Sequence, residues 1–223
     1  MNEIDIVSSF DESFCSENMV DLGINIGDTC IDLLSKSEII GTIPILGLLS
    51  GLYKIHQDVA TARLIKKIYI FLFTTQELTE DKKRKFINEL STELSDRGDE
   101  FLLDLINRLD NIHKTEILAN LVKHKVYGDL ECMEFILLCK ILENIPISFM
   151  TILPSYIKEK NNPGETDMLF SCGLLYVSSI HPDTYNLFKL NRNGYLLLKY
   201  GLEKDIIIPD TYPVNNSAYA VLS

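Results

Sequence analysis

The stretch FLLDLINRLDNIHKTEILANLVKHKV, residues 101–126, determines the class of fold that we predict for this chain. Apolar residues recur every three or four positions both before and after Asn111, and this spacing places them along one side of a helix. Gly128 follows at a position where a helix commonly ends, because glycine readily adopts the left-handed conformation needed there. The pattern predicts two helices within residues 97–127, forming a hairpin with their apolar faces turned toward each other.

The most unusual composition lies further toward the N-terminus, in IIGTIPILGLLSGLY, residues 39–53, which holds three glycines and no charge. As a helix this run reaches only about 22 Å, whereas the hydrocarbon layer of a bilayer is roughly 30 Å thick. Pro44 suits the first turn of a helix, where its missing N–H would be unpaired in any case. Together with the apolar run at residues 68–73, this stretch predicts a buried helical hairpin. Thr79, as N-cap, predicts the next helix over residues 80–94.

The apolar stretch also contains our candidate site for interaction or membrane activity. Gly47 and Gly51 stand one helical turn apart, a spacing that lets another helix approach closely. Two interpretations are open, namely close packing inside a helical bundle and insertion into a membrane after a rearrangement. The candidate residues are Ile43, Leu46, Gly47, Leu48, Gly51 and Leu52.

Beyond Gly128 the pattern changes to shorter elements, namely three short helices, two β-prone runs and a closing helix. The predicted ranges are 133–141, 147–157 and 165–172 for the short helices, 174–178 and 185–190 for the β-prone runs, and 195–202 for the closing helix. The turn-forming sequence His181-Pro182-Asp183 separates the two β-prone runs. This order of elements is that of a winged helix.

The helix that would enter a DNA groove, within residues 163–173, argues against nucleic acid as a partner. It carries Glu165 and Asp167 and no lysine or arginine. Contacts from basic residues to phosphates supply most of the nonspecific affinity for DNA, so an acidic helix would be repelled. A protein contact is the expected use of this element.

The predicted fold is therefore mainly α, with a helical bundle followed by a winged-helix-like subdomain that contains a β-hairpin. We expect four parts: an acidic N-terminal segment with one amphipathic helix, the helical bundle, the winged-helix-like subdomain and an irregular tail. Their predicted ranges are 1–38, 39–127, 129–204 and 205–223.

The net charge of −11 is concentrated at the N-terminus, where residues 1–38 hold nine carboxylates against the single base Lys36. Such a segment repels phosphate backbones and anionic lipid, and it could attract a basic partner or cover a basic surface of its own protein. The other interpretation is a solvated acidic face on the amphipathic helix expected at residues 16–37.

No pattern in the sequence points to catalysis or to a cofactor. The glycines of residues 39–53 lack the Lys-Ser/Thr of a phosphate-binding loop, and the four histidines lack the spacing of a zinc site. The five cysteines form no CxxC pair, which favours a reducing compartment. The first residues lack the features of a secretory signal. We therefore expect a cytoplasmic protein that is not an enzyme and binds no metal or cofactor.

Several stretches resemble a group of uncharacterised helical proteins from prokaryotes whose C-terminal part is winged-helix-like and which have no assigned activity. They are Ile43-Pro44-Ile45-Leu46-Gly47, Leu52-Tyr53-Lys54, Leu64-Ile65-Lys66-Lys67, Gly173-Leu174-Leu175, and residues 190–202 with Asn193-Gly194. The resemblance implies a bacterial or phage origin, and it implies a role such as phage defence. It transfers no functional residues.

Two functions follow as hypotheses. The first is a non-enzymatic interaction or regulatory protein, with a protein partner or a second copy of the chain bound to its surface. The second is a membrane-acting effector that stores residues 39–53 and 68–73 in a soluble bundle and releases them on a trigger. Burial distinguishes the two, because a fully packed run favours the first and an exposed apolar groove favours the second.

Overall fold

The computed structural model describes residues 3–16, 41–180 and 186–210. These residues are mainly helical and include one two-stranded antiparallel hairpin, as predicted, whereas the winged-helix-like arrangement stays a prediction. The chain forms two compact units, Met1–Cys139 and Lys140–Ser223. The helix predicted at residues 16–37 and the turn at residues 181–183 lie outside the described residues, and the four-part division of the chain stays a prediction.

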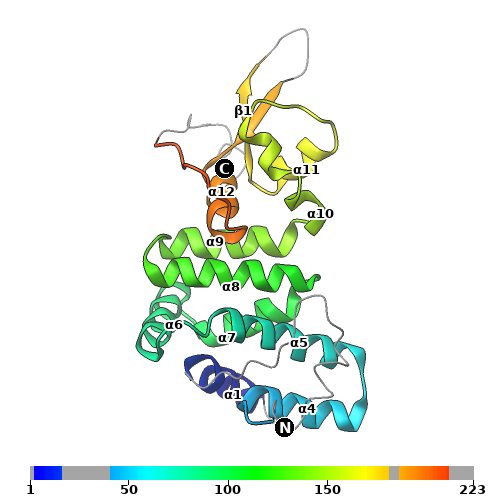
Figure 1. Ribbon diagram of the computed structural model, residues 1–223, viewed down its shortest axis with the longest axis vertical. Helices are drawn as coiled ribbons and strands as arrows, with labels where there is room; N and C mark the ends of the chain where they lie inside the picture. The colour runs from blue at the N-terminus through cyan, green and yellow to red at the C-terminus, as the bar shows by residue number, and fades with distance from the viewer. Residues whose placement is uncertain (1–2, 17–40, 181–185, 211–223) are drawn as a thin grey trace. The chain divides into compact units, whose positions relative to one another are not determined.

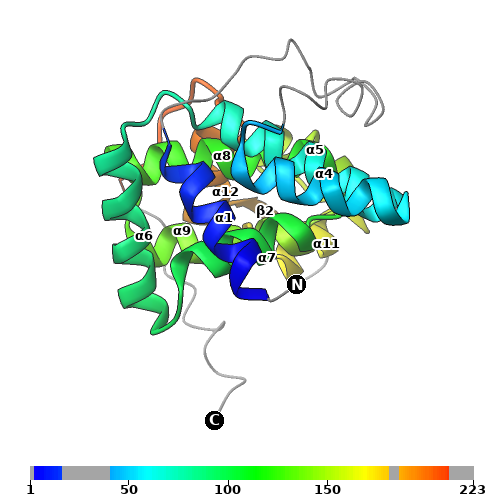
Figure 2. The ribbon, with the colours of Figure 1, turned by 90° about the horizontal axis from the view of Figure 1, so that it is seen from below.

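The first unit is a helical bundle built around α5. Its helices are α1 (Glu3–Cys15), α4 (Pro44–His56), α5 (Val59–Thr74), α6 (Glu80–Leu94), α7 (Gly98–Arg108), α8 (Ile112–Tyr127) and the start of α9 (Cys132–Asn144). Helix α5 packs against α4, α7 and α8, and Figure 1 shows α5 and α8 side by side. Helix α1 lies between α4 and α6 and also contacts α7 (Figure 2).

Aromatic side chains join the helices at the centre of this unit. The ring centroids of Phe14 and Phe71 are 5.5 Å apart, and those of Phe14 and Phe86 are 6.5 Å apart. Phe135 of α9 contacts Phe86 edge to face at 5.4 Å. Aromatic pairs at such separations add to the stability gained from burial. Helix α1, which the sequence analysis did not predict, is therefore an integral part of the core.

Helix α1 also caps α4. The N-cap position of α4, Ile43, has no polar side chain to satisfy the first amide groups of the helix. The buried Ser13 hydroxyl of α1 accepts a hydrogen bond from the Ile45 N–H at 3.0 Å instead. A side chain 32 positions away in the sequence thus takes the role of a local cap.

The helices predicted from residues 80–127 are present, but their packing differs from the prediction. Helix α6 spans Glu80–Leu94 as predicted, although the side chain of Thr79 makes no capping hydrogen bond. Gly128 ends α8 with a φ of 87°, in the left-handed region. Helix α7 packs mainly on α6, α1 and α5, and α8 packs mainly on α5 and α6. The expected apolar hairpin was wrong in this respect, because the apolar faces of α7 and α8 are covered by these other helices rather than by each other.

The second unit combines short helices with the hairpin. Its elements are the end of α9, α10 (Ile147–Met150), η1 (Leu153–Ile157), α11 (Glu165–Ser171), β1 (Leu175–Ser179), β2 (Leu187–Leu190), α12 (Arg192–Leu196) and η2 (Leu197–Gly201). Strands β1 and β2 pair antiparallel with Leu175 opposite Leu190. The backbone of Lys160 also pairs with Phe188, through hydrogen bonds of 2.9 and 3.1 Å. The two predicted β-prone runs are therefore confirmed as a hairpin.

Two glycines provide a matched test of the packing in the first unit. A Cβ atom at Gly98 would lie 2.7 Å from the carbonyl oxygen of Ile87, whereas one at Gly51 would meet nothing within 4 Å. We expect Gly98→Ala to lower the free energy of unfolding by about 1–3 kcal/mol, because a backbone atom cannot give way easily. Gly51→Ala should raise it by up to about 1 kcal/mol, through better helix propensity. Denaturant unfolding measures both, and equal stability of the two variants would contradict the described packing.

Candidate functional site

The outward side of α4 carries a row of apolar residues that the bundle does not cover. Leu48 and Leu52 are half-buried, Gly51 is exposed, and Ile55 is 74% exposed. Their spacing of three and four residues places them on one face of the helix. We call these four residues the outer stripe. Val59, the first residue of α5, is 65% exposed and follows Ile55 by four residues, after the turn at Gln57 and Asp58.

The other candidate residues of this stretch are in the interior. Ile43 and Leu46 are buried, together with Ile45 and Leu49 on the same side of α4. A Cβ atom at Gly47 would lie 2.9 Å from the carbonyl oxygen of Gly41, so this glycine allows close packing against the preceding turn and not against another helix. Of the six candidate residues, the structure thus brings Leu48, Gly51 and Leu52 together on the surface.

The second apolar run is buried except at its last residue, Phe73, which is half-buried. Residues 68–72 of α5 are all buried, and none of their side chains is more than 6% exposed. The predicted hairpin of the two runs exists, since α4 and α5 are neighbours. Of the two helices in this hairpin, only α5 has an unbroken series of buried apolar residues, 68–72.

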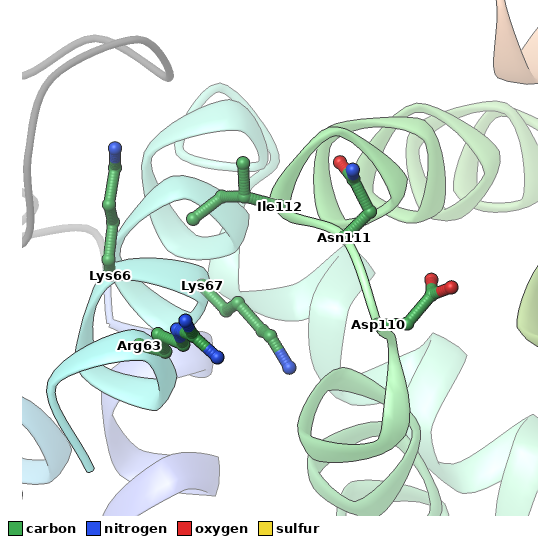
Figure 3. A pocket seen from close by; sticks show the side chains of 6 residues that line it. All are labelled: Arg63, Lys66, Lys67, Asp110, Asn111 and Ile112. Carbon is green, nitrogen blue, oxygen red and sulfur yellow. The ribbon is translucent and has the colours of Figure 1, made fainter. Parts of the chain in front are cut away.

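A cavity of about 320 Å³ lies between α5 and the turn that joins α7 to α8. Arg63, Lys66 and Lys67 line it from α5, and residues 110–112 line it from the turn. Figure 3 shows Arg63 and Lys67 extending on the side that faces the turn, whereas Lys66 points away from them. We call this cavity the basic pocket. Three bases against one acid stand out in a chain whose net charge is −11.

Lys67 holds the end of α7 in place. Its ammonium group donates hydrogen bonds to the carbonyl oxygens of Ile106 (3.1 Å) and Asn107 (2.9 Å), in the last turn of that helix. A cation at this position compensates the negative end of the helix dipole. Burial lowers the pKa of Lys67, Asp110 opposes this effect, and the positive charge of Arg63 adds to it.

The single carboxylate of the basic pocket is already paired. Asp110 lies 2.7 Å from the ammonium group of Lys114, which is only 1% exposed. Of the two partners, only Asp110 is at the surface. Arg63 is exposed and has no hydrogen bond or ion pair with any described residue. The pocket therefore presents more positive than negative charge.

Sequence reasoning did not identify Arg63 and Lys67 as a site. Their spacing of four residues places both on one face of a helix, and they precede an uncharged apolar run. The sequence therefore indicates two bases on one face of a helix, but it does not indicate which part of the chain lies opposite them. The turn at residues 110–112 approaches α5 only through the packing of α7 and α8 on it.

Two further observations concern thiol and metal chemistry among the described residues. Burial and the neighbouring Asp11 raise the pKa of the Cys15 thiol to about 12. No group of three His, Cys, Asp or Glu side chains among the described residues could hold a metal ion. In the same part of the chain, no helix has the length and apolar character needed to cross a membrane.

Comparison of the chain with protein-family models, with curated proteins and with solved structures found no match. Any function must therefore be argued from the apolar surface of α4 and from the basic pocket.

The two cations of the basic pocket should differ in their effect on stability. Lys67→Met removes both hydrogen bonds to the end of α7, and we expect it to lower the free energy of unfolding by about 1–2 kcal/mol. Arg63→Met should change it by no more than about 0.5 kcal/mol, because Arg63 is exposed. Urea denaturation of both variants checks this difference. A larger loss in Arg63→Met than in Lys67→Met would contradict the assigned roles.

Cys15 should be unreactive in the folded protein. With a pKa of about 12, roughly one Cys15 thiol in 10⁴ is ionised at about pH 8, and only the thiolate is alkylated. We expect iodoacetamide to modify the half-buried Cys172 well before Cys15, and both equally in denaturant. Peptide mass spectrometry after timed labelling measures the two rates. Rapid labelling of native Cys15 would refute its burial against α6.

Proposed function

We propose that the chain is a non-enzymatic interaction or regulatory protein, and that it binds a protein partner or a second copy of itself through the outer stripe of α4 and Val59. The observation that carries this proposal is the exposure of Ile55 and Val59, 74% and 65%, next to two half-buried leucines on a well-packed bundle. Contiguous apolar surface of this kind marks interaction sites, because association removes it from water.

The packing of the inner side of α4 favours binding of a partner to its outer side. Ile45 and Leu46 anchor the inner side of α4 in the core, and Ser13 holds its first turn. A partner therefore meets a helix whose conformation is already set, which lowers the entropic cost of binding. Full burial of a side chain such as Ile55 contributes about 1.5–3 kcal/mol, so a few such residues can dominate the affinity.

The alternative is a membrane-acting effector that releases residues 39–53 and 68–73 on a trigger. The observation that favours it is the uncharged outer face of α4, which could also lie against lipid. Release of α5 would be costly, since each large apolar side chain of residues 68–72 loses about 1.5–3 kcal/mol on exposure. Their sum approaches the whole stability of a typical domain, about 5–15 kcal/mol. We therefore rank this function second.

For the C-terminal unit we propose a winged-helix-like subdomain that contacts protein rather than DNA. The order of α10, η1, α11, the hairpin and α12 supports this assignment. Exposed Asp167 and half-buried Glu165 on α11 disfavour a phosphate backbone. A bacterial or phage origin, a role in phage defence and a cytoplasmic location stay predictions.

A double substitution in the outer stripe tests the primary proposal. We expect Leu52→Ser with Ile55→Ser to abolish self-association in sedimentation velocity, or the specific retention of a partner by the immobilised full chain. Met133 and Leu137 on α9 are also exposed, at 60% and 44%, and one turn apart. Met133→Ser with Leu137→Ser is therefore the matched control, and it should behave as the unchanged protein does. Circular dichroism establishes that both variants fold.

Two results would count against the proposal. If both double variants retained the partner equally, the outer stripe would not be part of the interface. Leakage of dye from liposomes that Leu48→Asp abolishes in a folded variant would support the membrane-acting alternative instead.

A further inference from the structure

We propose that the basic pocket receives a carboxylate from an acidic peptide segment of the partner, and that an apolar side chain of the same segment rests on Val59 and Ile55. The inference rests on the proposed function and specifies the chemistry of the partner. In this proposal Arg63 binds the carboxylate of the segment, and Ile55 and Val59 contact its apolar side chain.

The charges of the pocket are unbalanced in favour of an incoming anion. Asp110 pairs with Lys114 at 2.7 Å and also favours the charged form of Lys67, so its single negative charge is shared between two lysines. Lys67 is fixed by two backbone carbonyl groups, which carry only partial charges. Arg63 has no partner among the described residues and is exposed beside Lys67. An added carboxylate would relieve the repulsion between these two bases.

The identity of the cation favours a carboxylate. The planar guanidinium of arginine matches the two oxygens of a carboxylate and can donate two parallel hydrogen bonds to them. The ammonium of Lys67 adds a positive charge nearby without leaving its place at the end of α7. Helix α8 begins at the pocket with no acidic residue in its first turn, and the Asn111 side chain caps it by accepting a hydrogen bond from the His113 N–H.

The apolar residues around the pocket favour a peptide over a free phosphate or a nucleic acid. Half-buried Ile112 forms part of the pocket wall. Val59 lies one helical turn before Arg63, and eight residues of helix, about 12 Å, separate Val59 from Lys67. An acidic residue and an apolar residue on one short segment can span this distance. Binding of a nucleic acid would require several lysine or arginine side chains that are not already paired with acids. The net charge of −11 would also repel its phosphates.

The test uses the full chain and a fluorescein-labelled peptide of alternating aspartate and leucine, with binding followed by fluorescence polarisation. We expect Arg63→Glu to weaken binding at least about tenfold, and Arg63→Gln to weaken it less. Lys85 is an exposed base on α6, so Lys85→Glu changes the net charge equally and is the matched control. It should alter the affinity by less than about twofold.

A double-mutant cycle distinguishes direct contact from a general charge effect. Replacing the aspartates of the peptide by asparagine should weaken binding to the unchanged protein, but have little further effect on Arg63→Glu. Non-additive losses of this kind identify groups in contact. Replacing the leucines by serine should likewise have little further effect on a Val59→Ser variant.

Four outcomes would overturn the inference. They are additive losses in the cycle, an equal effect of Lys85→Glu, displacement of the peptide by millimolar inorganic phosphate, and stronger Arg63-dependent binding to phosphatidylserine vesicles than to the peptide. A fifth outcome is peptide binding that appears only after the acids between residues 17 and 38 are replaced by their amides. This result would identify the chain's own acidic segment, rather than a partner, as the occupant of the basic pocket. If Leu52→Ser with Ile55→Ser still abolishes partner binding, the proposed function survives the loss of this inference.

Discussion

The structure of the first unit depends on the burial of α5. Its side chains from Ile68 to Leu72 form a continuous apolar run without a polar face, and all five are buried. A helix that is apolar on nearly all sides must be surrounded. Helices α4, α7 and α8 provide that cover, and Phe71 brings in α1 through Phe14. The arrangement of the bundle follows from this requirement.

The two features of the candidate site are consequences of the same burial. Helix α4 contributes one face to covering α5 and α1, so its remaining apolar face is left outside. Near the middle of α5, just before the buried run, Lys67 reaches carbonyl groups in the last turn of α7 and thereby fixes the turn that carries Asp110. The outer stripe of α4 and the basic pocket of α5 thus lie on two consecutive helices that pack against each other. This proximity is the physical basis for assigning them to one partner.

Several elements could be predicted because their signals are local. Gly128 ends α8 through its own left-handed conformation, and the helix from residue 80 begins and ends where its composition indicates. The β-hairpin followed from β-prone runs on either side of a turn sequence. Helix α1 was not predicted, although Phe10 and Phe14 have helical spacing, because acidic residues and serines interrupt the apolar residues of its sequence. In α9 the exposed Met133 and Leu137 are as apolar as the buried Phe135 and Leu138, so composition alone does not identify the buried face.

The sequence by itself determined that the chain is mainly helical, where most helices begin and end, and that residues 39–53 are unusually apolar. Only the tertiary structure decided which of those apolar residues are buried, because α4 lacks a polar face that would mark its outer side. It alone decided that Ser13 caps α4 and that Asp110 meets α5, since these groups are far apart in the sequence. Periodicity reports the side of a helix on which apolar residues lie. The choice of neighbouring helix depends on the packing of the whole unit.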